Sequence, residues 1–390
     1  MIFLLLFSTL NGAFHLFRAK QLWKSKVLSF TDRGYSTLRL EVDLNITDPE
    51  NTTLELSTDE SYKLRIYPVG KRIRASIASK NFFGARHGLE TLDQLIVVDG
   101  LRNELRIPKS VNITDRPSYR YRGILIDTAR SFVDVEALKW TIDAMGASKL
   151  NTLHWHITDS QSFSFESKSF PELTRLGAYG DEYVYSETTV RELVEYARIR
   201  GVRIIPELDA PAHVGEGWQF APGTVLCFKA KPWREFCLEP PCGQLDPTND
   251  QVYDILGGVY TDMIRAFNST FLHMGGDEVN FNCWNSSQTI QKWLEARNLN
   301  NASNVAFHDL WNYFQTRALK KLYAANGGNK VTAIVWTNSL LNSTKVRTNN
   351  VLHGNTGSFL RYTIYSMLSV CIDRHLSVSR SVSVQSCQIS

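Results

Sequence analysis

After Pro117 the sequence alternates between short apolar runs and amphipathic helical patterns, and this alternation limits the folds that the chain can adopt. The apolar runs are YRGILID, NTLHWHITD, VRIIPELDAPAH, TFLHMGGDE and KVTAIVW, and a helical pattern separates each from the next. Such alternation predicts a parallel sheet with helical crossovers. Both a doubly wound sheet and a closed (β/α)8 barrel have this pattern.

Each apolar run ends in side chains that can bind a ligand or take part in chemistry. In chain order they are Asp127, Arg130, His154, His156, Asp159, Glu207, Asp209, His213, Asp277, Glu278 and Trp336. In a (β/α)8 barrel the carboxyl ends of all strands meet on one face, where active sites lie. No glycine-rich phosphate loop follows the first run, which argues against a dinucleotide-binding sheet. We therefore predict an α/β fold of the (β/α)8 TIM-barrel class.

The adjacent carboxylates Asp277 and Glu278 are the strongest candidate for an active site. The Asp-Glu pairs at residues 59–60 and 181–182 have polar or glycine neighbours and are typical of solvated turns. By contrast, TFLHMGG ahead of Asp277 predicts a buried strand, and its two glycines let the backbone turn or approach another group closely. The alternative interpretation is a polar turn at the end of a buried strand.

The residues before Pro117 predict a smaller α+β domain. Residues 37–68 and 72–79 alternate with the period of strands, and FFGARHGLETLDQLI predicts a helix. We expect this domain over residues 21–116, a partial barrel over 117–350 and a divergent tail over 351–390.

Several features indicate a secreted or lysosomal protein. The first 20 residues contain an apolar segment of signal-peptide length without a leading Lys or Arg, and we predict a signal peptide there. No other stretch is long and apolar enough to span a bilayer. Seven N-glycosylation sequons occur, which is typical of a secreted or lysosomal glycoprotein: Asn45, Asn51, Asn112, Asn268, Asn285, Asn301 and Asn342.

Four of the six cysteines cluster in the sequence, and the other two lie in the tail. The clustered ones are Cys227, Cys237, Cys242 and Cys283. In an oxidising compartment they predict two disulfides, and three pairings are open. No His/Cys spacing is typical of a zinc site, and we expect no metal or cofactor. A net charge of +4 without basic runs and interleaved aromatics argues against nucleic-acid binding.

Four stretches resemble β-N-acetylhexosaminidases of glycoside hydrolase family 20. They are RYRGILIDTAR, KLNTLHWHITDSQSFSFESKSFPELTRLGAYG, RGVRIIPELDAPAHVGEGW and HMGGDEVNFNCWNSS. The stretch LCFKAKPWREFCLEPPCGQLDPTND is similar to arthropod members, including chitooligosaccharide-degrading enzymes. The resemblance implies retaining exo-hydrolysis of terminal N-acetylhexosamine from chitooligosaccharides or N-glycans, with the substrate's own 2-acetamido group as nucleophile.

The resemblance also implies roles for the adjacent acids. Glu278 would be the general acid, with a pKa raised by its ionised neighbour and by a dry pocket. Asp277 would stay ionised, accept the acetamido N–H and stabilise the positively charged oxazolinium intermediate. The two acids would titrate as a pair.

Other roles follow by position in the same way. Arg130 would grip hydroxyls of the terminal sugar with its rigid fork of donors. Asp159, His213 and Glu207 would form a polar, sugar-contacting network. Trp336 would be one wall of the pocket around the acetamido group. For each residue the alternative is a structural role in a salt bridge or in the core.

The cysteine-rich loop carries a second set of implied residues. Trp233, Leu238 and Glu239 lie where arthropod members contact a second sugar. The implied disulfides are Cys237–Cys242 and Cys227–Cys283, which would brace loops on the active face. The implied partner is an N-acetylhexosamine-containing oligosaccharide, and family members are often homodimers.

The resemblance runs from residue 55 to about residue 345, and the Ser-rich tail has no glycine after Gly357. A full barrel needs about three more strands, so we expect open sheet edges and exposed apolar stripes on helices. We interpret the tail as translated intron or an alternative exon. Two hypotheses follow: an exo-acting hydrolase, or an inactive truncated isoform that binds sugar or a partner. A chitinase-like barrel of another family is disfavoured because no D-x-x-D-x-D-x-E run occurs.

Overall fold

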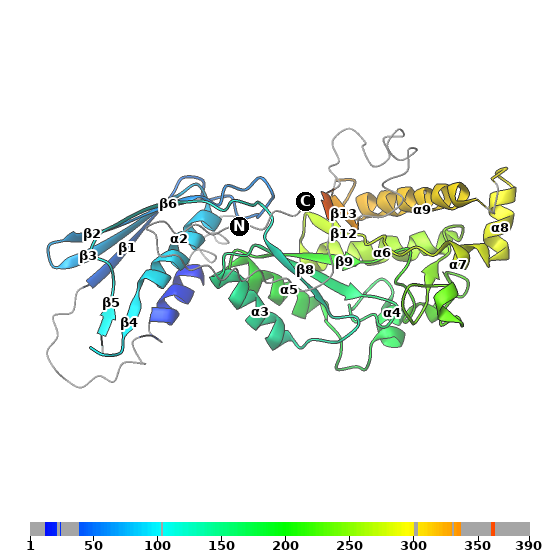
Figure 1. The fold of residues 1–390 in the computed structure, drawn as a ribbon, viewed down its shortest axis with the longest axis horizontal. Helices are drawn as coiled ribbons and strands as arrows, with labels where there is room; N and C mark the ends of the chain where they lie inside the picture. Colours follow the sequence, from blue (N-terminus) through cyan, green and yellow to red (C-terminus); the bar gives the residue numbers. More distant parts are fainter. Residues whose placement is uncertain are drawn as a thin grey trace.

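A computed structural model shows a small N-terminal domain beside a larger α/β domain (Figure 1). The structure describes residues 12–21, 24, 39–102, 104–299, 303–329 and 331–336, together with the backbone of residues 360–362. Of the helices within this described part, none has the length and apolar character needed to cross a membrane.

The N-terminal domain is a four-stranded sheet with a helix packed against it. Its elements are β1 (Arg39–Ile46), β2 (Tyr62–Val69), β3 (Arg72–Ser79), α2 (Phe82–Leu95), the hairpin β4 (Val97–Asp99) and β5 (Glu104–Arg106), and β6 (Val111–Asp115). The strand order is β1-β3-β2-β6, with β1 parallel to β3 and the other pairs antiparallel. Alternate residues of β2 and β3 are buried because α2 covers one face of the sheet. The predicted strands and helix are confirmed, whereas β4, β5 and β6 were not predicted.

Residues 12–21 form a helix that packs against α2. Ala13 and Phe17 are buried in the core of the N-terminal domain, and Lys20 Nζ lies 3.0 Å from Glu90 Oε2 on α2. The predicted signal peptide spans residues 1–20, of which 1–11 lie outside the described residues. The described remainder belongs to the folded domain that was predicted to begin at residue 21.

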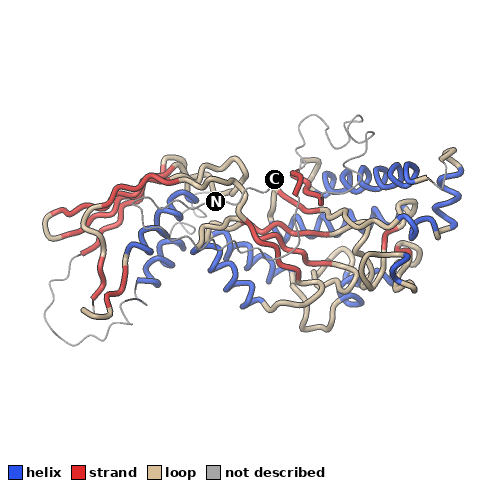
Figure 2. Tube along the Cα trace, in the orientation of Figure 1, coloured by secondary structure: helices blue, strands red, loops and turns tan. Residues whose placement is uncertain are grey.

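The larger domain contains a six-stranded parallel sheet with helices along it (Figure 2). Its sheet strands are β7 (Gly123–Asp127), β8 (Thr152–Thr158), β9 (Arg203–Leu208), β12 (Phe271–His273), β13 (Thr332–Trp336) and β14 (Leu360–Tyr362). Its helices are α3 (Val135–Ala147), α4 (Pro171–Gly177), α5 (Glu187–Arg198), α6 (Asp250–Phe267), α7 (Phe281–Asn285), α8 (Gln288–Glu295) and α9 (Asn304–Ala325). Two short strands, β10 (Val225–Leu226) and β11 (Gln244–Leu245), pair with each other in a long loop after β9.

Strand order in this sheet follows chain order from β7 to β14, and every neighbouring pair is parallel. A doubly wound sheet reverses its order at a switch point, whereas a barrel adds each strand on the same side of the last. The order therefore favours the predicted barrel over the doubly wound alternative. The five predicted strands are confirmed. The tail was expected to contain no clear β-α unit, and this stays a prediction. Residues 360–362 form the strand β14, which pairs with β13, and the rest of 351–390 lies outside the described residues.

Both faces of β8 are covered, as a parallel barrel strand requires. Trp155 and Ile157 point into the apolar core shared with the outer helices. His154 and His156 alternate with them and face the opposite side, toward β9. His154 and His156 thus contribute polar side chains to the interior of the barrel.

One edge of the described sheet is open, as expected from the sequence. Among the described residues β7 has a single neighbouring strand, β8. Leu125 on β7 is 38% exposed, and Trp140 on α3 is 70% exposed. A tryptophan as exposed as Trp140 is rare on a helix that has neighbouring helices on both sides. The exposure of Trp140 therefore agrees with an open edge at β7.

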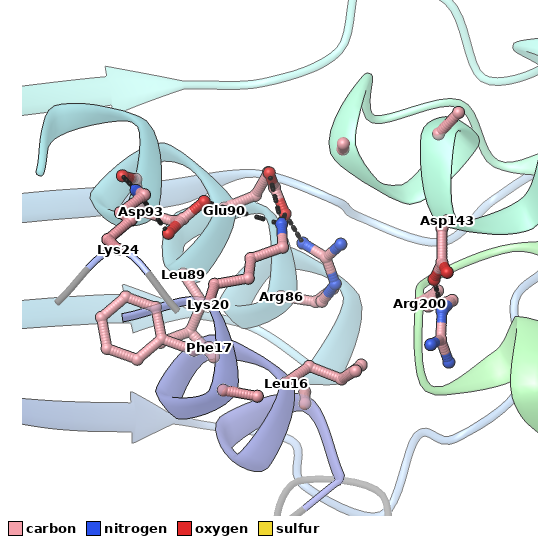
Figure 3. A pocket seen from close by; sticks show the side chains of 14 residues that line it. Leu16, Phe17, Lys20, Lys24, Arg86, Leu89, Glu90, Asp93, Asp143 and Arg200 are labelled. Atoms are coloured by element: carbon pink, nitrogen blue, oxygen red, sulfur yellow. Dashed lines mark hydrogen bonds and ion pairs between the residues drawn. The ribbon is translucent and has the colours of Figure 1, made fainter. Parts of the chain in front are cut away.

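A cavity of about 650 Å³ lies where the N-terminal helix, α2 and α3 meet (Figure 3). Its charged side chains are paired: Arg86 with Glu90 on α2, and Arg200 with Asp143 on α3. None of the predicted site residues lines this cavity. It is a feature of the junction between the two domains.

Glu60 is a buried carboxylate that joins the two domains. Its Oε2 lies 2.8 Å from His87 Nε2 on α2, while its Oε1 accepts hydrogen bonds from Arg122 Nη1 (3.0 Å) and Asn151 Nδ2 (2.9 Å) of the barrel domain. Burial would raise the pKa of Glu60, but the contacts with His87 and Arg122 lower it to about 2. The ionised carboxylate is therefore strongly preferred at this junction.

Replacement of Glu60 by Gln should reduce the free energy of unfolding by about 3 kcal/mol at pH 7, because Arg122 loses its buried partner. The folded-state pKa of Glu60 lies below its ordinary value of 4.5. Its contribution is thus complete above that value and is lost as the pH falls toward 2. Urea denaturation between pH 7 and pH 3 measures the difference between the two proteins.

The control is Glu136→Gln, which removes an exposed carboxylate paired with Lys139 and should change stability little. A difference between wild type and Glu60→Gln that stays constant down to pH 3 would contradict the assigned charge state.

Candidate active site

The carboxyl ends of β8, β9 and β12 bring three other predicted residues together around His213. Its Nδ1 lies 3.3 Å from Asp159 Oδ1, and its Nε2 lies 3.3 Å from Glu278 Oε2 and 3.6 Å from Asp277 Oδ1. Asp159 is fully buried, whereas Asp277 and Glu278 are about one-third exposed (32% and 31%). One imidazole therefore connects an interior carboxylate with two acids that solvent can reach.

Arg130 lies at the edge of the same cluster. Its Nη2 is 3.1 Å from Asp159 Oδ2, and its guanidinium also binds Asp127 and Glu239. Asp127 ends β7 and accepts the main-chain N–H of Arg130 at 3.0 Å, which fixes the turn that carries the arginine. The fold thus brings Arg130 to Glu239, which is 109 positions later in the chain.

Two residues of this cluster have left-handed backbone conformations. His213 has φ 56° and Glu278 has φ 52°. Residues other than glycine adopt this region uncommonly, and such strain gathers at functional sites. The strained backbone at His213 and Glu278 therefore supports a functional role for these two residues.

Asp209 is a strand-end carboxyl group to which the sequence analysis assigned no role. Its Oδ1 accepts the N–H of Gly276 at 2.8 Å, and a Cβ atom on Gly275 would lie 1.7 Å from the same oxygen. Gly275 and Gly276 also have φ values of +63° and +89°. The prediction that these glycines permit a close approach is confirmed, and the group approached is Asp209.

Burial raises the pKa of Asp209 well above its ordinary range, and the charge of Asp277 adds to the shift. Burial also raises the pKa of Asp277, although the neighbouring His213 opposes this. Both carboxyl groups therefore bind a proton more readily than isolated carboxyl groups do. That Asp277 is ionised during the reaction stays a prediction.

Glu207 lies beneath the open site and is fully buried. Its carboxylate meets three imidazoles: His154 Nε2 at 2.7 Å, His156 Nδ1 at 2.9 Å and His273 Nδ1 at 3.0 Å. The ring of Trp336 at the end of β13 packs against this group, with its centroid 4.4 Å from that of His273. The predicted network member Glu207 is thus placed below the site, and Trp336 packs against two of the histidines that contact it, His154 and His273.

The clustered imidazoles and carboxylates raise the question of a bound ion. Ligand-type atoms lie within 4.8 Å of one another in three groups: His154, Glu207 and His273; His156, Glu207 and Asp209; and Asp209, His213 and Asp277. Close imidazole–carboxylate contacts of 2.7 to 3.0 Å account for the first group. We assign no metal and no cofactor to these residues.

Both disulfides have the pairing implied by the resemblance. Cys227–Cys283 and Cys237–Cys242 are formed, and the first ties the long loop to α7, shortly after Glu278. The loop carries the three residues predicted for a second sugar subsite. Glu239 reaches Arg130, Leu238 is 68% exposed, and Trp233 is half-buried beneath the guanidinium of Arg234.

Comparison with protein families gives matches over both domains. A model described as glycosyl hydrolase family 20, catalytic domain, matches residues 119–354, and a model described as beta-acetyl hexosaminidase like matches residues 12–95. The chain belongs to glycosyl hydrolase family 20. The resemblance noted in the sequence is confirmed, and the (β/α)8 barrel with a small α+β domain is the fold of this family.

Two insect relatives are similar over most of this chain. The chitooligosaccharidolytic beta-N-acetylglucosaminidase of Bombyx mori is 48% identical over 330 residues, covering 83% of this chain and 55% of that protein. The enzyme of the same name from Ostrinia furnacalis is 51% identical over 297 residues, covering 76% and 50%. This family 20 chain therefore spans about half the length of these relatives.

A solved family 20 structure matches with a similar extent. The chitobiase of Flavobacterium johnsoniae aligns with a TM-score of 0.64 and 27% identity, covering 84% of this chain and 47% of that one. The exo beta-N-acetylglucosaminidase of Vibrio harveyi, solved with N-acetylglucosamine, aligns with a TM-score of 0.63 at 24% identity and supports the fold alone.

Substitution of Gly275 by Ala should destabilise the protein severely, because the new Cβ would overlap Asp209 Oδ1 in a backbone region that disfavours side chains. We expect a loss of several kcal/mol in the free energy of unfolding. Urea denaturation monitored by tryptophan fluorescence measures it.

The matched control is Gly70→Ala, which has a similar φ of +59° but no atom within 4 Å of the added Cβ. Backbone strain alone should cost about 1 kcal/mol there. Equal destabilisation by the two substitutions would show that the contact with Asp209 does not require glycine.

Proposed function

We propose that this chain carries the active site of a retaining exo-hydrolase, which removes terminal non-reducing N-acetylhexosamine from chitooligosaccharides or N-glycans. The observation that carries the proposal is the contact of His213 with both Asp277 and Glu278 at the barrel mouth, beside Arg130. A donor, an orienting carboxylate and a sugar-gripping guanidinium are the groups that substrate-assisted hydrolysis needs.

In the proposed mechanism Glu278 donates its proton to the glycosidic oxygen as the bond from that oxygen to the anomeric carbon breaks. The carbonyl oxygen of the substrate's acetamido group attacks the anomeric carbon and forms the oxazolinium ion. Asp277 accepts the acetamido N–H, which aims the carbonyl and offsets the positive charge of the ring. Glu278 then takes a proton from water, and the water oxygen bonds to the anomeric carbon and reopens the ring, with net retention.

The surrounding residues position the sugar and the two acids and do not transfer protons themselves. Arg130 is proposed to bind hydroxyl groups of the terminal sugar, and Trp336 to face the acetamido methyl. His213 and Asp159 would hold Glu278 in place. Glu207, being fully buried, supports this set from below.

A second sugar would lie over the disulfide-braced loop. Glu239 is already in contact with Arg130, and the exposed Leu238 and half-buried Trp233 sit on the same loop. Flat, partly apolar sugar faces suit such side chains. The names of the insect relatives favour chitooligosaccharides over N-glycans as substrate.

The disulfides and the seven sequons favour a secreted or lysosomal location for this protein. We also propose a homodimer as its assembly, by analogy with family members. Light scattering of the purified glycoprotein tests the dimer.

A second candidate function is an inactive form that binds sugar or a partner. The observation that favours it is the open edge of the described sheet at β7, together with the 70% exposure of Trp140 on α3.

Hydrolysis of a chromogenic N-acetyl-β-D-glucosaminide by the purified chain tests the proposal. Glu278→Gln should lower kcat on the order of 10²- to 10⁴-fold, because the leaving oxygen loses its proton donor. A chromogenic β-glucoside without the acetamido group should not be cleaved, since it lacks the nucleophile.

The control variant is Glu182→Gln, which alters the solvated Asp181-Glu182 pair and should leave kcat unchanged. If monodisperse wild-type protein cleaves neither substrate, the hydrolase proposal fails for this chain. Calorimetric titration with N-acetylglucosamine oligomers would then test the sugar-binding alternative.

A further inference from the structure

Glu207 is a buried carboxylate that the proposed reaction does not use directly. It lies on β9, with no exposed surface, and its neighbours are imidazoles from β8 and β12. A carboxylate is costly to bury, and it persists only where nearby groups compensate its charge. Because Glu207 lies below the candidate site, the imidazoles that compensate its charge can also affect the residues of that site.

The first link from Glu207 to the site is His156. Its Nδ1 lies 2.9 Å from Glu207 Oε2, and its Nε2 lies 2.8 Å from Asp159 Oδ2. A carboxylate beside each ring nitrogen favours a proton on both nitrogens, and the hydrogen bond between Nε2 and Asp159 orients the ring. Glu207 therefore stabilises the positive charge of His156.

The second step leads from His156 to the acids. Asp159 meets His156 through Oδ2 and His213 through Oδ1, and His213 meets Glu278. Charges alternate in sign from Glu207 outward: carboxylate, imidazolium, carboxylate, imidazolium and then the acid pair. Each group in such a chain holds its neighbours in one protonation state.

A separate branch leads from Glu207 to the aromatic wall. His273 and His154 both contact Glu207, and their ring centroids lie 4.4 Å and 5.4 Å from that of Trp336. The same buried carboxylate thus supports the proposed donor on one side and the proposed acetamido wall on the other.

We propose that Glu207 is a positioning residue for the reaction: by holding His156 as an imidazolium it keeps Asp159 and His213 aligned on Glu278, and through His273 it seats Trp336. This inference rests on the proposed function for its consequence in catalysis. The charge state of His156 that it assigns does not depend on activity.

The electrostatics of the interior agree with this assignment. Burial would lower the pKa of His156, but Glu207 and Asp159 raise it well above the ordinary value. Burial would raise the pKa of Glu207, yet the charges of His273 and His156 lower it well below its usual range. The titratable groups that face His156 are Glu207, Asp209, Asp159, His213, His154 and His273.

The test compares wild type with Glu207→Gln in kcat and KM against pH, using the chromogenic N-acetylglucosaminide. We expect kcat to fall on the order of 10²-fold, with a smaller change in KM, because misplacement of the acid costs rate more than binding. The alkaline limb of the profile should also move to lower pH, since His156 then loses its proton more easily. Glu207→Asp, which keeps the charge, should restore part of kcat.

The matched control is Glu60→Gln. It neutralises another buried carboxylate that contacts a histidine, but at the junction of the domains. It should lower thermal stability without moving the pH profile. If Glu207→Gln behaves in the same way, Glu207 is structural only and the proposal is overturned.

A nuclear magnetic resonance titration of the histidine rings in the wild type decides the case without activity. The His156 signals are identified by their loss in His156→Gln. We expect both His156 ring nitrogens to stay protonated from pH 6 to pH 8. A His156 ring that loses a proton in that range would overturn the proposal, even if Glu207→Gln cannot fold. If His156 behaves as expected but the wild type cleaves no substrate, the function has failed and the charge assignment stands.

Discussion

The candidate site depends on one buried carboxylate, Asp159. It has no exposed surface, and it is surrounded by His156, His213 and Arg130, with the N–H of Ser160 as a further donor. These groups hold the pKa of Asp159 far below its usual range despite burial. An interior charge tolerates little displacement, because each lost partner leaves a desolvated ion. The positions of the side chains at the barrel mouth are therefore fixed by the hydrogen bonds and ion pairs that compensate the charge of Asp159.

The fold satisfies Asp159 because parallel strands deliver their carboxyl ends to one place. His156 and Asp159 come from β8, His213 from the loop after β9, and Arg130 from the turn after β7. A register shift of one residue in β8 would turn His156 away from Glu207. The strand order β7-β8-β9-β12 is thus the physical cause of the charge pattern, and the Cys227–Cys283 disulfide holds the one long loop that borders it.

Sequence patterns predicted the strands β7, β8, β9, β12 and β13, the β-α alternation and the acid pair, because each has a local signature. Asp277 and Glu278 could be singled out since a buried strand and two glycines precede them. The role of Asp209 could not, because its contact with Gly276 joins positions 67 residues apart. The strands β5, β6 and β14 were missed because none of them lies in a continuous apolar run, and β4 follows directly on the predicted helix. The predicted signal peptide over residues 1–20 overlaps the helix over residues 12–21, because an apolar segment is typical both of an exported leader and of a helix that packs on a domain.

Glu60 and Glu207 show why a buried carboxylate cannot be interpreted from its partners alone. Both are buried and ionised, both contact imidazoles, and both have a lowered pKa. Glu60 contacts Arg122 and Asn151 across a domain junction, so its charge is used to hold two bodies together. Among the described residues the ion-pair contacts of Glu207 are with three imidazoles, and Asp209 also lies close to it. One of these imidazoles, His156, also contacts Asp159. Among the described residues the one carboxylate paired with Arg122 is Glu60, whereas the two ring nitrogens of His156 contact two carboxylates, Glu207 and Asp159. The choice of histidine around Glu207 is what extends its influence to the acids at the barrel mouth.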